Sequence, residues 1–191
     1  MNDPTLPHSN PNVNVHTRDE LMSLSSSIMQ LTVDCDCCNE EDLNILNICQ
    51  WPLLSVIEIG SHCFQYVEET GLIGLCNLER VVIGEKCFTD ATSSVKLNRQ
   101  FLLKDCPLIR ELKIGSKSFS VYLSFVLGNL PSLEVIEMGE LNRSSNNFYY
   151  ASLELKGGTR AVVVISRYPK TEIPSDWAVC ILGVFSRHVG E

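Results

Sequence analysis

The sequence lacks the long apolar segments and the basic clusters that mark several functional classes. Its longest apolar runs are residues 161–165 and 177–185, far shorter than the roughly 20 residues of a membrane-spanning helix. Acidic residues outnumber basic ones, 23 to 15, and the net charge is −8. Because lysine and arginine form no cluster, we expect neither nucleic acid nor an anionic membrane as the main partner.

An apolar signal segment is also missing from the start of the sequence. The first 20 residues are mostly polar and include an acidic residue, Asp3, whereas a secretory signal has a basic start and an apolar centre. We therefore expect a cytoplasmic protein, with association with a cell surface left open.

Motifs of common catalytic sites are absent. The sequence contains no nucleophile elbow, no phosphate-binding glycine loop and no H-E-x-x-H motif. Of the four histidines, only His62 lies well inside the chain, next to a glycine-containing turn. We therefore predict that the protein is not an enzyme and that it needs no cofactor.

One pattern, apolar-x-x-apolar-x-apolar-Gly, occurs four times. The copies start at Leu54, Leu78, Ile109 and Leu133 and end at Gly60, Gly84, Gly115 and Gly139. The glycines are 24, 31 and 24 residues apart, which is within or close to the period of leucine-rich repeats. A degenerate copy at 28–34 has Asp34 in the glycine position. The pattern predicts a leucine-rich-repeat-like solenoid, mostly β with short helical or irregular turns, of about four to five repeats with caps.

A pair of mostly apolar residues, two positions apart, precedes each copy and predicts a second extended segment in each repeat. These pairs are Leu46/Ile48, Thr70/Leu72, Phe101/Leu103 and Phe125/Leu127, and Leu153/Leu155 follows the last copy. The interval of 31 residues contains seven extra residues, which we place in the polar segment 89–94. We expect a surface loop there, either a neutral insertion or part of a binding face.

Three copies continue with a small residue and a phenylalanine. These are Cys63 with Phe64, Cys87 with Phe88, and Ser118 with Phe119. We expect the glycine to permit a sharp turn, the small residue to fit a tight corner, and the phenylalanine to fill the core. The fourth copy has Arg143 at the phenylalanine position, and we expect Phe148 to take over there.

The phrase I-G-x-x-small-Phe, at 59–64, 83–88 and 114–119, resembles the BspA-type leucine-rich repeat, a family of microbial interaction and cell-surface proteins. The resemblance covers about residues 28–157. It implies a right-handed, β-solenoid-like horseshoe that binds proteins. The sequence departs from the family in its fourth copy, in its lengthened second repeat and in its lack of an export signal.

The repeats also predict domain boundaries. Residues 1–14 contain three prolines and four asparagines, so we expect a disordered tail. Thr17 and Glu20 have capping-box spacing, which predicts a short helix at about 18–24 that caps the first repeat. The predicted solenoid, with this cap, covers 15–158. We expect 159–191 to form an irregular C-terminal cap or tail, with 161–165 as a last strand.

The predicted strand geometry points to a candidate binding surface. Residues between the inward apolar positions face away from the core, and in the four copies these are Val56, Glu58, Arg80, Val82, Glu111, Lys113, Val135 and Glu137. We predict a non-enzymatic scaffold that binds an unidentified protein through this face. A merely solvated face, in a purely structural member of a multicopy family, remains open.

A group of cysteines suggests an alternative function. Cys35, Cys37, Cys38 and Cys49 could supply thiolates to a metal-binding or redox module at 35–49. Their C-x-C-C spacing lacks the paired knuckles of structural zinc sites, so our main prediction contains no metal. Cys38 also falls at the position of the core phenylalanines. We expect most of the nine cysteines to be free, buried thiols.

Overall fold

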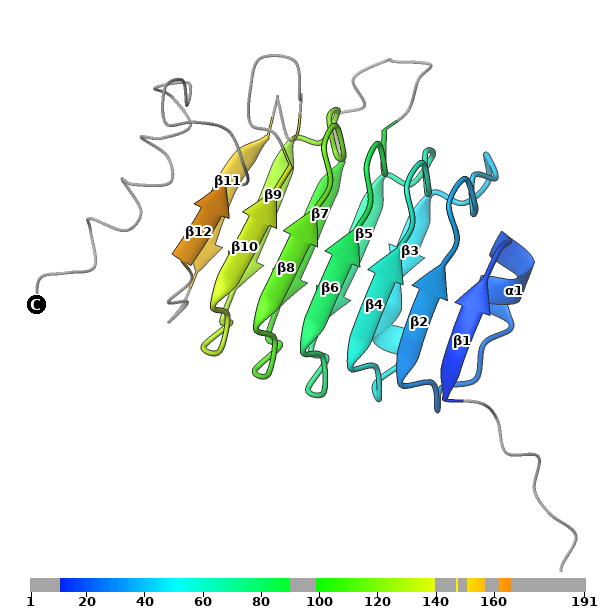
Figure 1. Cartoon of the computed structure of the whole chain (residues 1–191), viewed down its shortest axis with the longest axis horizontal. Helices are drawn as coiled ribbons and strands as arrows, with labels where there is room; N and C mark the ends of the chain where they lie inside the picture. Colours follow the sequence, from blue (N-terminus) through cyan, green and yellow to red (C-terminus); the bar gives the residue numbers. More distant parts are fainter. Residues whose placement is uncertain (1–10, 90–98, 140–146, 148–150, 157–161, 166–191) are drawn as a thin grey trace, which may run out of the picture.

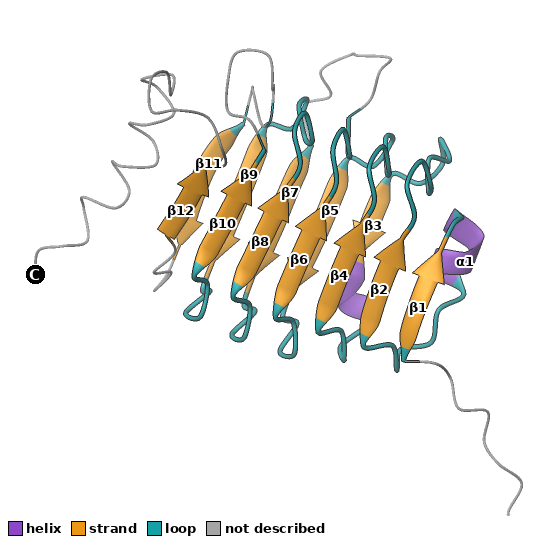
Figure 2. Cartoon of the chain, viewed as in Figure 1, coloured by secondary structure: helices purple, strands orange, loops and turns teal. Residues whose placement is uncertain are grey.

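The computed structural model describes residues 11–89, 99–139, 147, 151–156 and 162–165. It is mostly β, with strands that pair in parallel in two sheets (Figures 1 and 2). Sheet A contains β1 (Asn12–Val15), β2 (Gln30–Val33), β4 (Val56–Ile59), β6 (Arg80–Ile83), β8 (Glu111–Ile114), β10 (Val135–Met138) and β12 (Val162–Ile165). Sheet B contains β3 (Ile45–Asn47), β5 (Glu69–Ile73), β7 (Gln100–Lys104), β9 (Ser124–Gly128) and β11 (Ser152–Lys156).

From β2 onward the chain alternates between the two sheets, so consecutive strands of one sheet are neighbours in space. Helices are few in the described residues: α1 (Arg18–Met22) and the short 3-10 helix η1 (Ile48–Gln50). In this part of the chain, no helix has the length and apolar character needed to cross a membrane.

The core lies between the two sheets because buried and half-buried residues alternate along the strands. Ile57 and Ile59 on β4 are buried, whereas Val56 and Glu58 are half-buried, as expected for a strand with one face on a core. The inward residues of sheet A pair in one register, through Leu31, Ile57, Val81, Leu112 and Ile136. The predicted strand copies, including the degenerate one at 28–34, are therefore confirmed.

The second apolar register is also confirmed as sheet B. Its members pair in the order Leu46, Thr70, Phe101, Phe125 and Leu153. Ile48 differs from the prediction, because it begins η1 instead of continuing the strand. The Asn47 side chain accepts a hydrogen bond from the Cys49 N–H and so caps this turn.

Glycine ends the four regular sheet A copies because successive turns are in backbone contact. A Cβ on Gly84 would lie 2.6 Å from the carbonyl carbon of Gly60 and from the amide nitrogen of Ser61. Corresponding clashes, at 2.4–2.6 Å, would arise at Gly60, Gly115 and Gly139. None of these four glycines has a positive φ. The predicted reason, freedom for a sharp turn, is therefore wrong: the glycines are needed for close approach.

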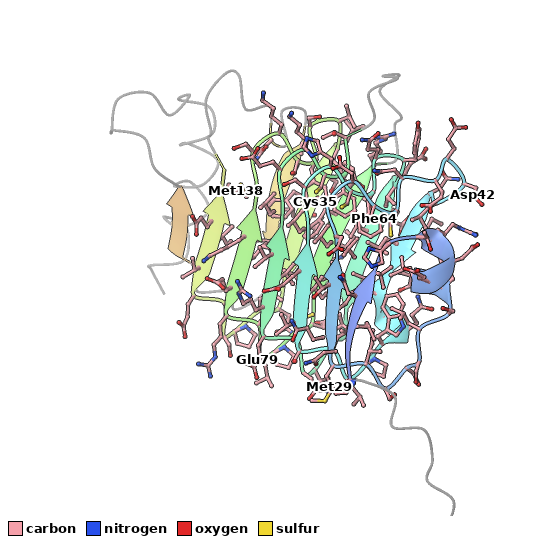
Figure 3. All side chains as sticks on the ribbon, turned by 45° about the vertical axis from the view of Figure 1, so that its right-hand side comes forward. Met29, Cys35, Asp42, Phe64, Glu79 and Met138 are labelled. Atoms are coloured by element: carbon pink, nitrogen blue, oxygen red, sulfur yellow. The ribbon has the colours of Figure 1, made fainter. Side chains whose placement is uncertain are left out.

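The unusual backbone of the turn lies two and four residues after Gly60, Gly84 and Gly115. Phe64, Phe88 and Phe119 each have a φ of 57°, a left-handed conformation that is unfavourable for a bulky residue. Their rings are fully buried and stacked, with centroids 5.3 Å apart for Phe64 and Phe88 and 4.5 Å apart for Phe88 and Phe119. Figure 3 shows Phe64 between the sheets. Ring burial offsets the backbone strain, and the predicted core role is confirmed.

The N-terminal end differs from the prediction. Residues 12–14, assigned to a disordered tail, form β1 together with Val15, and β1 pairs with β2. The predicted helix is confirmed as α1, although it ends at Met22: Thr17 accepts from the Glu20 N–H, and Glu20 accepts from the His16 N–H. Leu21 is fully buried, so α1 covers part of the core at the β1 end of the molecule (Figure 1).

The C-terminal end continues sheet A beyond the predicted boundary at residue 158. β12 pairs with β10 and forms the predicted last strand.

Strand register places the seven extra residues of the second repeat between Phe88 and β7. Phe64 precedes Glu69 of β5 by five residues, whereas Phe88 precedes Gln100, the partner of Glu69 on β7, by twelve. Our predictions for 90–94, Arg143, Phe148 and 166–191 fall outside the described residues.

Replacing Gly84 with alanine should destabilise the fold, because the new Cβ would overlap backbone atoms that cannot rotate away. We expect a loss of about 1–3 kcal/mol, the usual cost of overpacking, measured by urea unfolding. Gly71→Ala is the matched control, since its Cβ would meet only Ile73 Cδ1 at 4.0 Å. Equal destabilisation by the two substitutions would contradict the close-approach explanation.

Candidate protein-interaction surface

The eight predicted surface residues lie on one face of sheet A. They are the half-buried, outward positions of β4, β6, β8 and β10. Strand register places them in two columns: Val56, Arg80, Glu111 and Val135 in the first, and Glu58, Val82, Lys113 and Glu137 in the second. We call these eight residues the A face.

Ion pairs connect the charged residues of the A face into one network across four strands. Arg80 contacts the Glu58 carboxylate through Nη1, and its Nε lies 2.7 Å from Glu111 Oε2. Lys113 Nζ lies 2.7 Å from Glu111 Oε1 and 3.5 Å from Glu137 Oε2. The predicted pairing of Lys113 with Glu137 is present. Sequence reasoning missed Arg80 as the bridge, although Arg80 and Glu111 are neighbours in the first column.

Hydrogen bonds from the two cations hold the central carboxylate ionised. The pKa of Glu111 is lowered, first by the hydrogen bond from Lys113 and then by the one from Arg80. The pKa of Arg80 is raised by its bonds with Glu111 and Glu58, and that of Lys113 by its bond with Glu111. Because these side chains are about a third exposed, solvent screens the charges and the network contributes little to the stability of the fold. Its larger effect is to fix side-chain positions.

The outward face of sheet A extends further than the sequence predicted. β1 and β2 add the uncharged residues Asn12, Asn14, Gln30 and Thr32 beside the A face. The proline and asparagine content hid β1, but the alternation N-V-N-V at 12–15 was a usable signal. Asn14 Nδ2 donates to Asp34 Oδ1 at 3.0 Å, and His16 Nδ1 lies 3.1 Å from Asp34 Oδ2.

The four cysteines of the alternative module do not converge on one site. Cys35, Cys37 and Cys38 lie in the turn after β2, where Cys38 is buried in the core. Cys49 lies in η1, and its thiol donates to the Ile73 carbonyl at 3.1 Å. In the described part of the chain, no three His, Cys, Asp or Glu side chains are placed to hold a metal ion. The eight cysteines described are all free thiols.

Comparison with known proteins found no family model that matches the chain, no similar curated protein and no similar solved structure. The geometry of this chain is therefore the evidence for its function.

Acidification should weaken the A face network. Because the pKa of Glu111 is lowered in the folded protein, Glu111 stabilises the fold above its unfolded pKa, and this stabilisation disappears as the pH falls through the folded pKa. We expect the urea midpoint of the native protein to fall between about pH 5 and pH 3, and Glu111→Gln to lose less over this range. Glu134→Gln, at an exposed position directly before β10, is the charge-matched control and should retain the native pH profile. Identical profiles for all three proteins would contradict a lowered pKa at Glu111.

Proposed function

We propose that the protein is a non-enzymatic interaction scaffold, a leucine-rich-repeat-like solenoid of about four to five capped repeats, that binds a protein through the A face. The observation that carries this proposal is the assembly of the eight outward residues on one continuous, partly exposed face. A stack of similar units presents such a face on a rigid support, because each unit contacts only its neighbours.

Rigidity supports a role in recognition. A surface that is already ordered loses less conformational entropy when it binds. Backbone pairing of four adjacent strands holds the A face from beneath, and the ion pairs restrain Arg80, Glu111 and Lys113 from above. These three long side chains would otherwise each have to be immobilised by the partner.

The chemistry of the A face fits a protein partner with a mixed surface. Val56, Val82 and Val135 are apolar and half-buried, so they offer contact area between the charges. The network contains three carboxylates and two cations, so it carries one net negative charge. We also propose a cytoplasmic location, because free thiols suit a reducing compartment.

Removal of the paired charges should weaken binding and leave the fold intact. We expect a variant with alanine at four positions to recover at least about tenfold less of its specific partners, equivalent to roughly 1.4 kcal/mol. The four positions are Glu58, Arg80, Lys113 and Glu137. Recovery is measured by quantitative affinity purification from the native cell, with circular dichroism as the test of folding. The substitutions leave the net charge unchanged.

The control carries the same type of change elsewhere. Glu69 and Lys104 lie on the outward face of sheet B, and Glu79 and Arg110 precede β6 and β8. Alanine at these four positions also preserves the net charge and should retain the partners. If the A face variant is folded and recovers the same proteins as the native chain, the assignment of the A face is wrong.

A further inference from the structure

Three cysteines that are distant in sequence occupy the same position in three successive turns. Cys37, Cys63 and Cys87 each lie three residues after the end of a sheet A copy, at Asp34, Gly60 and Gly84. The three turns have the same backbone conformation, since the residues before and after each cysteine have positive φ: Asp36 and Cys38, His62 and Phe64, and Lys86 and Phe88. We call Cys37, Cys63 and Cys87 the thiol column.

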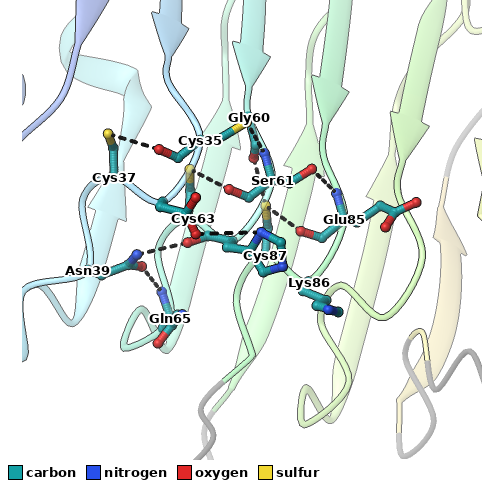
Figure 4. A network of polar contacts seen from close by, with 12 residues as sticks. Cys35, Cys37, Asn39, Gly60, Ser61, Cys63, Gln65, Glu85, Lys86 and Cys87 are labelled. Atoms are coloured by element: carbon teal, nitrogen blue, oxygen red, sulfur yellow. Dashed lines mark hydrogen bonds and ion pairs between the residues drawn. The ribbon is translucent and has the colours of Figure 1, made fainter.

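The thiols of the column share one orientation. Each donates a hydrogen bond to the carbonyl two residues earlier: Cys37 to Cys35 at 3.3 Å, Cys63 to Ser61 at 3.5 Å, and Cys87 to Glu85 at 3.6 Å. Cys63 and Cys87 also donate to the turn before them, to the carbonyls of Asp34 at 2.9 Å and Gly60 at 3.0 Å. Figure 4 shows the three side chains side by side in successive turns.

The spacing of the column suits a disulfide. Paired parallel strands lie about 4.8 Å apart, and disulfides join residues with Cα atoms about 4.4–6.8 Å apart. The turns after β2 and β4 keep this close approach, because a Cβ on Gly60 would lie 2.6 Å from the Cys35 nitrogen. The Cys63 thiol also reaches this neighbouring turn, since it lies 2.9 Å from the Asp34 carbonyl, so rotation of the cysteine side chains is the movement that brings the sulfur atoms of Cys37 and Cys63 together.

The members of the column differ in access to solvent. Cys63 and Cys87 are fully buried, whereas Cys37 is only half-buried. A small oxidant reaches Cys37 before the others. Cys63, in the adjacent turn, is then the thiol placed to react with an oxidised Cys37.

We propose that Cys37 and Cys63 form a reversible disulfide when a hydroperoxide oxidises Cys37. The Cys37 thiolate attacks the peroxide, its sulfur gains one oxygen as a sulfenic acid, and water or an alcohol leaves. The Cys63 sulfur then attacks the Cys37 sulfur, the S–S bond forms as the S–O bond breaks, and the departing hydroxide takes the Cys63 proton to become water. Two thiols and one peroxide thus give one disulfide and two small products.

The surroundings of Cys37 make the oxidation step slow. Burial, followed by the neighbouring Cys63, Asp34 and Asp36, raises the pKa of Cys37, so little thiolate is available at neutral pH. We therefore expect a response to sustained peroxide exposure, faster at higher pH, instead of rapid peroxide turnover.

A serine at the corresponding position of another turn indicates which substitution of these cysteines should be tolerated. The next turn has Ser118 at the column position, and its hydroxyl donates to the Gly84 carbonyl at 2.8 Å, as the thiols do in their turns. Serine therefore fits this corner, and Cys37→Ser and Cys63→Ser should fold. Cys37→Ala provides a second variant without a hydrogen-bond donor, and Cys35→Ser removes a nearby exposed thiol as the matched control.

The test is peptide mapping of the full chain after treatment with hydrogen peroxide and alkylation of the remaining thiols. Cleavage after glutamate places Cys37 in peptide 21–40 and Cys63 in peptide 59–68. We expect a cross-link between these peptides in the native chain and in Cys35→Ser, reversed by dithiothreitol, and at least a tenfold loss in Cys37→Ser and Cys37→Ala. The proposal is overturned if the cross-link persists in the Cys37 variants, if Cys63 joins Cys87 instead, or if Cys63 remains fully alkylated after peroxide treatment.

Discussion

Backbone contact between successive turns is the constraint on which the rest of the structure depends. At the turns after β4, β6, β8 and β10, a glycine donates its N–H to a carbonyl of the neighbouring strand: Gly60 to Val33, Gly84 to Ile59, Gly115 to Ile83 and Gly139 to Ile114, at 2.7–2.8 Å. Only a residue without a Cβ permits this approach. The close contact fixes the spacing of the phenylalanine rings beneath and of the A face residues in front, so the core and the surface share one register.

A second set of contacts satisfies the carbonyl groups that this stacking buries. The side chains of Cys63, Cys87, Ser118 and Asn147 donate to the carbonyls of Asp34, Gly60, Gly84 and Gly115, respectively. A buried carbonyl without a partner costs free energy. The residue at this position is therefore selected for its hydrogen-bond donor as well as for its size, which explains why cysteine, serine and asparagine all occur there. Asn147 is buried and fills this role for the fourth copy.

Sequence reasoning predicted the features that repeat with regular spacing. The inward apolar residues, the phenylalanines and the A face follow from periodicity, because each strand has only two faces. It missed features that depend on contacts between distant residues. Asn147 lies eight residues after Gly139 instead of three, so no spacing rule identified it. Similarly, the Arg80 side chain is long enough to contact Glu58 and Glu111 on the two neighbouring strands. The proline and asparagine content around β1 concealed the pairing of β1 with β2.

Asp34 shows how such a chain could change its length. It occupies the glycine position in the turn after β2, beside the segment that connects β1 to α1, and its carboxylate contacts Asn14 and His16. This terminal arrangement occurs once, whereas the contacts between Gly60 and Gly139 recur from turn to turn. Duplication or loss of one whole unit of 24 residues between these glycines would recreate the same contacts at the new junction. The array can therefore be lengthened or shortened internally by recombination, while its first turn stays unique.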